Sequence, residues 1–330
     1  MSIITSDMEQ RLTWVDMERG IAMICVFVWH IGLFRENANF PWYIFFEYFL
    51  IPVFFFISGY LFKDRVDNRC DFSRIIKRLL IPYFVLGFVI GIKPTAIQDG
   101  GILNGMLLSA KHVVQGRELW FIACLVIVEL LAVGIKNLYN VIGKTPLKIA
   151  IAVMSMGSYF LLFRGGVILP DYWCWCEALV GIGFFMGGSL YRKYESVLTV
   201  NDNKTAYVLF TIYLVLTILC HYVLGCHMNY ASLSISNPIV SFFLSWFSLI
   251  VLTNLCKFVP ANQVIIKIGR STLFLFAINI WVIKSLASID CYLSFVPTWI
   301  VGILMAMVSI LISLFLNEIM KKIAPWSIGE

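Results

Sequence analysis

The chain has 330 residues, of which 60% are hydrophobic, 15% aromatic and only 13% charged. Soluble globular chains carry about 25% charged and about 45–50% apolar residues, so this composition excludes an ordinary soluble domain. Apolar runs long enough to cross a bilayer core of about 30 Å recur along the whole length. The sequence therefore predicts an all-α fold, a polytopic membrane bundle. No long polar stretch separates a second domain, and one integral-membrane domain is expected over residues 1–330.

Ten transmembrane helices are predicted, separated by proline, glycine and charged residues. They cover residues 20–35, 41–62, 79–93, 119–135, 147–163, 173–191, 206–224, 238–256, 271–288 and 296–318. The longest connection, residues 94–118, contains "ILNGMLLSAKHVV", for which a short interfacial or re-entrant helix is expected. No small-residue cleavage site follows the first apolar run, so that run is expected to remain as a span.

The lysine and arginine residues are distributed unevenly between alternate connections. The termini and the connections on their side hold 19 of the 25 lysines and arginines, against five on the other side. Because connections rich in lysine and arginine stay in the cytoplasm, both termini are predicted to be cytoplasmic. The remaining cation, Lys284, lies inside the ninth predicted span.

The first predicted span contains "RGIAMICVFVWH", which begins at Arg19 and ends at His30. Eleven residues make about 16 Å of helical rise and three turns plus roughly 20°, so both side chains face the same way. In one interpretation, Arg19 extends to the interface and His30 finds a polar partner in the bundle. In the other, both line one polar path across the membrane. Ionisable groups at depth are expensive and usually functional, which favours the second interpretation.

The segment "RIIKRLLIPYF" forms the start of the third predicted span. Arg74, Lys77 and Arg78 stand at positions i, i+3 and i+4, which predicts one cationic face. That face is either a cytoplasmic anchor or a phosphate clamp for an anionic ligand. Pro82 is expected to reshape the first membrane turn, because proline removes a helical hydrogen bond.

Three further segments carry candidate residues. In "PVFFFISGYLF", the small pair Ser58 and Gly59 permits close helix approach. In "GRELWFIACL", Trp120 is an ordinary interfacial tryptophan, whereas Glu118 at the outer mouth of the fourth span is a candidate to bind a sugar hydroxyl. The segment "IGRSTLFLFAINIWVIK" places Asn279 inside the ninth span.

Other polar residues inside predicted spans have less defined roles. Each of Glu47, Glu129 and Glu177 is expected to pair with another span. The segment "CHYVLGCH" contributes Cys220, His221, Cys226 and His227, but their spacing fits neither a one-turn ligand pair nor a zinc-finger pattern, so no metal is expected. The nine cysteines lie mostly in apolar segments, where they act as small hydrophobes and indicate no disulfide framework.

Taken together, five of these motifs resemble the membrane acyltransferase-3 family, bacterial integral-membrane O-acyltransferases of about ten spans. "WVDMERGIAMICVFVWH" is similar to the family's first span, in which an arginine, ten residues and a histidine form the signature. "PVFFFISGYLF" resembles the second-span motif, and "RIIKRLLIPYF" the basic motif before the third span. "ELWFIACL" and "IGRSTLFLF" match later landmarks. The resemblance covers nearly the full chain, with the motifs in the family's order.

The resemblance implies a location in the bacterial cytoplasmic (inner) membrane. It implies an acyl-CoA donor, usually acetyl-CoA, and a sugar hydroxyl acceptor on a lipid-linked or extracytoplasmic glycan, with no metal and no nucleic acid. His30 would be the catalytic base, because an imidazole near neutral pKa can deprotonate a hydroxyl. The residues expected to bind the donor are Arg19, Arg74, Lys77 and Arg78. The supporting or acceptor-side residues are Asp16, Ser58, Glu118, Trp120 and Asn279, with Asp16 one turn from Arg19 and placed to orient it.

One departure from the family pattern concerns Asn279. Family members with the "IGRSTLFLF" landmark often carry a histidine a few residues later, where this chain has Asn279. Asparagine cannot act as a base at neutral pH, which leaves the acid–base work to His30.

Two other functions remain open at the level of sequence. A transporter or flippase of a glycan or small molecule would involve no covalent chemistry, and the absence of an evident internal repeat argues against it. An acyltransferase acting on an amino group or a small metabolite would use the same residues.

Overall fold

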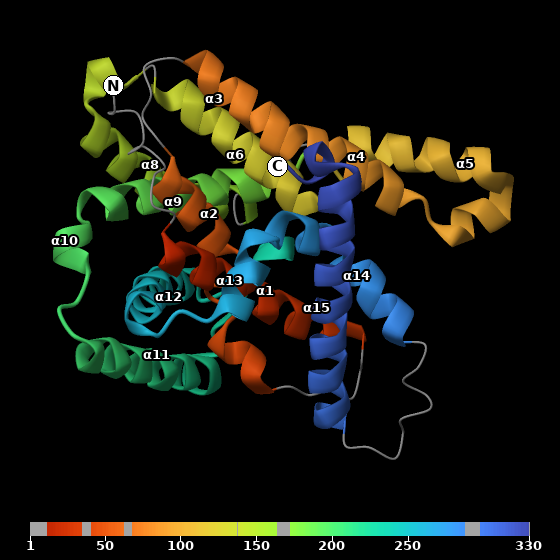
Figure 1. The fold of residues 1–330 in the computed structure, drawn as a ribbon. Helices are drawn as coiled ribbons and strands as arrows, with labels where there is room; N and C mark the ends of the chain where they lie inside the picture. The colour runs from red at the N-terminus through yellow and green to blue at the C-terminus, as the bar shows by residue number, and fades with distance from the viewer. Residues whose placement is uncertain are drawn as a thin grey trace, which may run out of the picture.

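The computed structural model describes residues 12–34, 41–62, 68–136, 138–163, 172–287 and 298–329, which form a largely helical fold (Figure 1). Within these ranges the only sheet is a two-stranded hairpin, in which β1 (His227–Asn229) pairs antiparallel with β2 (Ser234–Ser236). The helical class predicted from composition is confirmed.

The helices follow the predicted segments along the chain, and each predicted segment overlaps at least one of them. Their bounds are α1 (Thr13–Phe34), η1 (Pro41–Phe45), α2 (Pro52–Leu61), α3 (Asn68–Ile75), η2 (Ile76–Leu80), α4 (Ile81–Gly91), α5 (Pro94–Val114), α6 (Trp120–Lys136), α7 (Tyr139–Ile142), α8 (Lys144–Phe163), α9 (Trp175–Lys193), α10 (Glu195–Leu198), α11 (Asn203–Leu224), η3 (Tyr230–Ser232), α12 (Pro238–Phe258), α13 (Gln263–Arg270), α14 (Thr272–Ala287), α15 (Thr298–Ile323) and η5 (Pro325–Ile328).

Four of the described helices are long and apolar enough to cross a membrane, namely α8, α11, α12 and α15. The pair α13 and α14 adds a fifth if it is one span, bent by 88°. The protein is therefore a multi-pass membrane protein, whereas ten spans and cytoplasmic termini stay predictions. The long helices also run in different directions: in Figure 1 α15 stands upright, whereas α11 lies horizontally at the lower left.

Proline and glycine explain where the predicted spans break. The predicted span 41–62 divides into η1 and α2, and Pro52 begins α2. The first N–H groups of a helix have no helical partner, so the missing N–H of proline costs no hydrogen bond there. Residues 76–80 form a π-helical turn in which the Ile81 N–H donates to the Ile76 carbonyl. Pro82 has no N–H for the Arg78 carbonyl one turn earlier, so the predicted reshaping at Pro82 is confirmed.

The connection between the third and fourth predicted spans contains the expected helix. This helix, α5, is interrupted at Gly100 and Gly101, where Gly101 has a φ of +77° that favours glycine. It packs on α4, where the Ser109 hydroxyl donates to the Phe88 carbonyl at 2.7 Å. Together α4 and α5 extend from one side of the fold (Figure 1).

Glycines allow the central helices to touch backbone to backbone. A Cβ on Gly59 would lie 1.7 Å from the Phe185 carbonyl oxygen, and one on Gly188 would lie 1.8 Å from the Phe56 carbonyl oxygen. These two contacts join α2 to α9. In the same way, a Cβ on Gly269 of α13 would lie 1.8 Å from the carbonyl oxygen of Asp16 on α1. The close helix approach predicted from Ser58 and Gly59 is confirmed.

Candidate functional site

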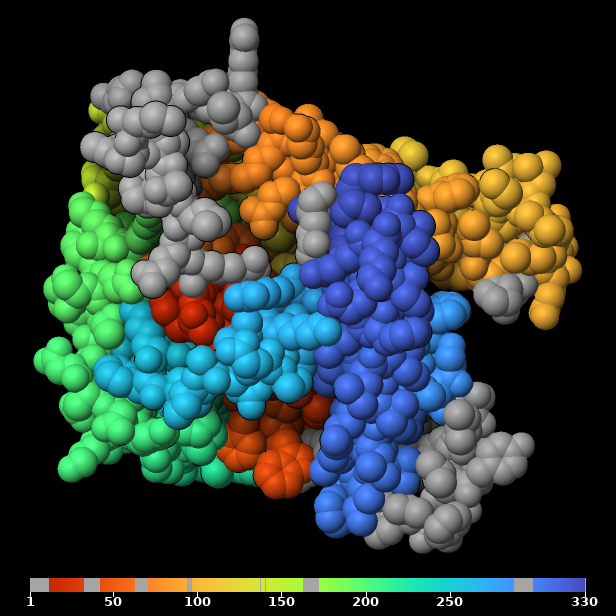
Figure 2. All heavy atoms as spheres, in the orientation of Figure 1, coloured from red at the N-terminus to blue at the C-terminus, as the bar shows by residue number. Residues whose placement is uncertain are grey.

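A cavity of about 580 Å³ lies among α1, α2, α6, α13, α14 and the segment from α3 to α4. Four arginines line this arginine cavity: Arg19, Arg74, Arg78 and Arg270. The space-filling view is hollowed between the orange residues of α3 and η2, the light-blue residues of α13 and the blue C-terminal end (Figure 2). Ile328 and Gly329 complete the wall at that end. The cavity therefore concentrates positive charge contributed by three distant parts of the chain.

Buried carboxylates hold two of the four arginines. Arg270 donates from Nε to Asp16 Oδ2 at 3.0 Å, and Asp16 is only 1% exposed. Arg74 lies 3.7 Å from Asp71 and 3.9 Å from Glu129. The ion pair shown for Asp16 is thus with Arg270 of α13, and its expected role in orienting Arg19 stays a prediction.

Two of the three cations of the basic motif lie in the wall of the arginine cavity. Arg74 and Arg78 line the cavity, whereas Lys77 is exposed and lies outside the lining. The reason is the π-helical turn over residues 76–80, since its wider i→i+5 turn changes the direction of side chains relative to an α-helix. A role for Lys77 in binding the donor therefore stays a prediction.

Two neighbouring aromatic rings form part of the cavity wall. Phe121 of α6 and Phe276 of α14 both line it, with ring centroids 4.8 Å apart. One turn further along α14, the Asn279 Nδ2 donates to the Phe276 carbonyl at 2.6 Å. Asn279 is 1% exposed and lies within hydrogen-bonding reach of His30. His30, three turns along α1 from Arg19, does not line the cavity itself, but its neighbour Asn279 lies one helical turn from the lining residue Phe276.

The His30 imidazole is well placed for a reactive role. Its Nδ1 is buried and makes no hydrogen bond with any described residue, and the same holds for Asn279 Oδ1. A buried polar atom without a partner is costly, so such an atom usually has a ligand or a chemical role. The structure thus brings His30 and Asn279 together, as two predicted site residues from distant spans.

The other predicted residues divide into two groups. Ser58 lines the arginine cavity, and Trp120 packs edge-on against Phe121 at a centroid distance of 6.0 Å. Glu118 lies elsewhere, 3.1 Å from Lys93 and 3.3 Å from His112. Its proposed contact with a sugar stays a prediction, because the partners shown for it belong to the protein.

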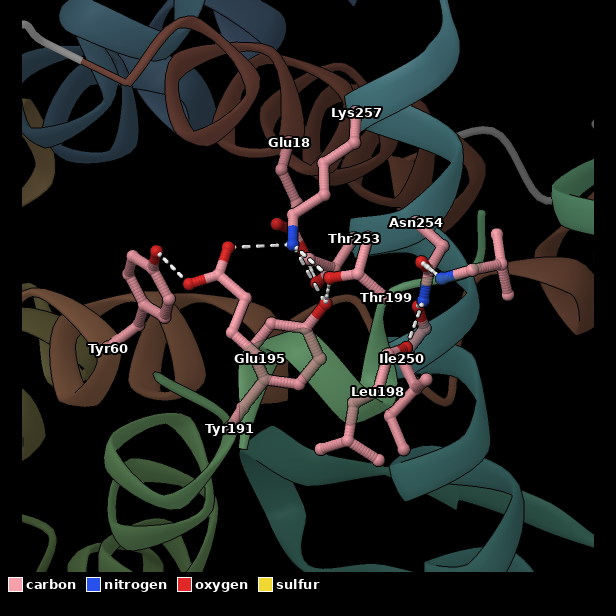
Figure 3. A network of polar contacts seen from close by, with 11 residues as sticks. Glu18, Tyr60, Tyr191, Glu195, Leu198, Thr199, Ile250, Thr253, Asn254 and Lys257 are labelled. Carbon is pink, nitrogen blue, oxygen red and sulfur yellow. Dashed lines mark hydrogen bonds and ion pairs between the residues drawn. The ribbon is translucent and has the colours of Figure 1, made fainter. Parts of the chain in front are cut away.

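A polar network beside α1 was not predicted from the sequence (Figure 3). The Lys257 ammonium donates to Glu195 at 2.8 Å, to the Thr199 hydroxyl at 2.6 Å and to the Tyr191 hydroxyl at 3.1 Å. The Tyr60 hydroxyl donates to the other Glu195 oxygen at 2.7 Å. This network joins α2, α9 and α12. In the sequence these residues appear only as isolated charged and hydroxyl side chains. Nothing there indicates which of them would interact.

Glu18, next to Arg19, is fixed in the same region (Figure 3). It is fully buried and accepts a hydrogen bond from the Thr253 hydroxyl at 3.0 Å. Because Glu18 is locked against α12, the neighbouring Arg19 backbone has little freedom. The position of Arg19 at the cavity wall therefore depends on α12 as well as on α1.

The remaining buried carboxylates pair with other segments, as expected for Glu47 and Glu129. Glu47 lies 4.0 Å from His221 and 3.7 Å from His227. Burial and the nearby His221 lower the pKa of His227. Among the described residues, no three histidine, cysteine or acidic side chains gather in a metal-binding arrangement.

Apolar helices surround a cavity lined by four arginines, and they define a multi-pass membrane protein. The family model described as "Acyltransferase domain", of the acyltransferase-3 type, matches residues 12–318. The chain belongs to the acyltransferase-3 family and is an acyltransferase, as its five motifs predicted. Searches among curated proteins and among solved structures gave no significant match.

Proposed function

We propose that this protein is an acyl-CoA-dependent O-acetyltransferase of the bacterial inner membrane. It transfers an acetyl or other short acyl group to a sugar hydroxyl of a cell-surface polysaccharide or its lipid-linked precursor. The observation that carries the proposal is the arginine cavity, in which Arg19 of the first motif meets Arg74 and Arg78 of the third. These residues lie far apart in the sequence and share a wall only in the fold.

The cavity matches the chemistry of an acyl-CoA donor. Guanidinium groups bind phosphate through paired hydrogen bonds, and Arg19, Arg74 and Arg78 offer such groups. The lining also contains apolar residues, among them the adjacent rings of Phe121 and Phe276. A donor with phosphates at one end and an uncharged thioester arm at the other would bind with its arm directed toward His30.

His30 then serves as the general base. Its imidazole takes the proton of the sugar hydroxyl, and the hydroxyl oxygen attacks the thioester carbonyl carbon. The tetrahedral intermediate collapses with cleavage of the carbon–sulfur bond, and the departing thiolate takes the proton from the imidazolium. The products are the sugar ester and the free thiol of the donor. Asn279 would hold the imidazole in place, because its buried Oδ1 suits a ring N–H.

A direct test uses the protein purified into nanodiscs with labelled acetyl-CoA and a lipid-linked glycan acceptor. Label is expected in the glycan, as an alkali-labile ester. In parallel, the surface glycan of a deletion strain should lack acetyl mass that a plasmid copy restores. Unchanged acetylation in that strain, together with no transfer in vitro, would contradict the proposal.

Replacing Arg78 with alanine is expected to raise the KM for acetyl-CoA. Losing a hydrogen bond to a charged group removes about 1.5–3 kcal/mol, or roughly ten- to hundredfold in affinity. The KM for the acceptor should change little, because Arg78 lies at the basic end of the cavity. Steady-state kinetics with each substrate varied in turn give both values.

The matched control for this prediction is Lys77→Ala, one residue away. It removes the same charge from the same helical segment and both residues are exposed, but only Arg78 lines the cavity. If Lys77→Ala raises the KM for acetyl-CoA as much as Arg78→Ala does, the motif acts only as a diffuse positive surface.

A further inference from the structure

A second pocket, of about 440 Å³, lies beside the arginine cavity. Its lining combines four cations with two hydroxyl groups: Lys144, Lys148, Arg192, Lys193, Thr145 and Ser189. We call it the lysine pocket. It is built from the first residues of α8 and the last residues of α9, which pack closely against each other. None of the described residues that line it is acidic.

The lining is arranged to stabilise an anion. Lys148 is only 7% exposed, and its Nζ donates to the Ser189 hydroxyl at 2.7 Å. Arg192 donates to the Tyr60 carbonyl at 3.4 Å. Removing an ammonium group from water is expensive, and like charges brought together repel each other. A bound anion would accept hydrogen bonds from these donors and reduce the repulsion between them.

The two cavities share a wall, which is the side chain of Phe62. The Arg74 guanidinium lies 5.5 Å from the centre of the Phe62 ring, and the Lys136 ammonium 5.4 Å. Both cations are also paired with carboxylates, Lys136 with Asp71 and Arg74 with Asp71 and Glu129, so what connects the two cavities is the ring of Phe62. A single elongated ligand has room to place one charged group in each.

We propose that the lysine pocket is a phosphate-binding site. Ammonium, guanidinium and hydroxyl donors on several sides suit the oxygens of a phosphate group. The phosphate comes from one of two sources: the nucleotide end of the donor in the arginine cavity, or the headgroup of an anionic lipid at the membrane surface. The first source rests on the proposed function, whereas the second does not.

The test compares a double variant of the pocket with a charge-matched control. Lys144→Gln/Lys193→Gln removes two exposed cations from the lining, so the fold should be retained. Lys204→Gln/Lys322→Gln removes two exposed cations that line neither cavity. Both proteins are purified into nanodiscs of phosphatidylcholine. Binding of CoA and of dephospho-CoA is measured by calorimetry, and retention of phosphatidylglycerol by native mass spectrometry.

If the donor supplies the phosphate, the pocket variant should bind CoA about tenfold more weakly while lipid retention stays unchanged. If a lipid supplies it, phosphatidylglycerol should be lost about tenfold more readily while CoA binding stays unchanged. Lys144→Arg/Lys193→Arg should restore wild-type behaviour in either case. The proposal is overturned if the pocket variant matches the control double variant in both measurements. A protein that binds no CoA at all would contradict the proposed function, and the lipid measurement alone would then decide the role of the pocket.

Discussion

Replacing His30 with alanine is expected to lower kcat for acyl transfer by about 10²–10⁴-fold, which is the contribution typical of a general base. Among the described residues, His30 carries the one buried ring nitrogen without a hydrogen-bond partner. Donor affinity should stay within about twofold, because the residues that line the arginine cavity are untouched. Single-turnover transfer from labelled acetyl-CoA, with donor binding measured by calorimetry, separates the two effects.

The control for this prediction is His227→Ala, which removes an imidazole in the β1 hairpin. His227 is 39% exposed and pairs with Glu47, far along the chain from the arginine cavity. This variant should keep its transfer rate. A second variant, His30→Gln, keeps a polar side chain but no base and should be as inactive as His30→Ala. Undiminished transfer in either His30 variant would remove His30 from the chemistry.

The sequence predicted the positions of the helices well, because long apolar runs are a strong signal. Its motif residues also converge: Arg19, Ser58, Arg74 and Arg78 share one cavity, and His30 meets Asn279. The choice of these residues as site residues followed from the family resemblance and, for Arg19 and His30, from helical periodicity along the first predicted span. Both the motifs and the periodicity can be read directly from the amino-acid sequence.

The partners of those residues could not be predicted in the same way. Arg270 and Asp16 form an ion pair across 254 positions, and no local pattern connects them. The spacing of the basic motif also gave no sign that Lys77 would lie outside the cavity lining, because residues 76–80 form a π-helical turn and not a regular α-helix. The C-terminal Ile328 and Gly329 reach the cavity wall through a short 3₁₀ segment that has no hydrophobic periodicity. Such features depend on tertiary contacts.

Replacing Gly59 with alanine is expected to destabilise the protein severely. In an ordinary helix this change stabilises by about 1 kcal/mol, since alanine loses less backbone entropy than glycine. Here the new methyl group would stand 1.7 Å from the Phe185 carbonyl oxygen and 2.9 Å from the Phe185 Cα. Both atoms belong to the backbone of α9, so no side-chain rotation relieves the clash. The helices must separate, and the loss should exceed the about 1–3 kcal/mol of common overpacking.

The control is Gly157→Ala in α8, where a Cβ would meet nothing within 4 Å. This variant should unfold at the same or a higher temperature than the wild type, whereas Gly59→Ala should unfold at a lower one. Thermal unfolding in detergent, followed by size-exclusion chromatography, measures both. Equal behaviour of the two variants would show that α2 and α9 are not in backbone contact. Because Ser58 and Phe62 flank Gly59 and line the cavities, separating α2 from α9 should also weaken donor binding. The same close contact that stabilises the fold therefore also sets the shape of the site.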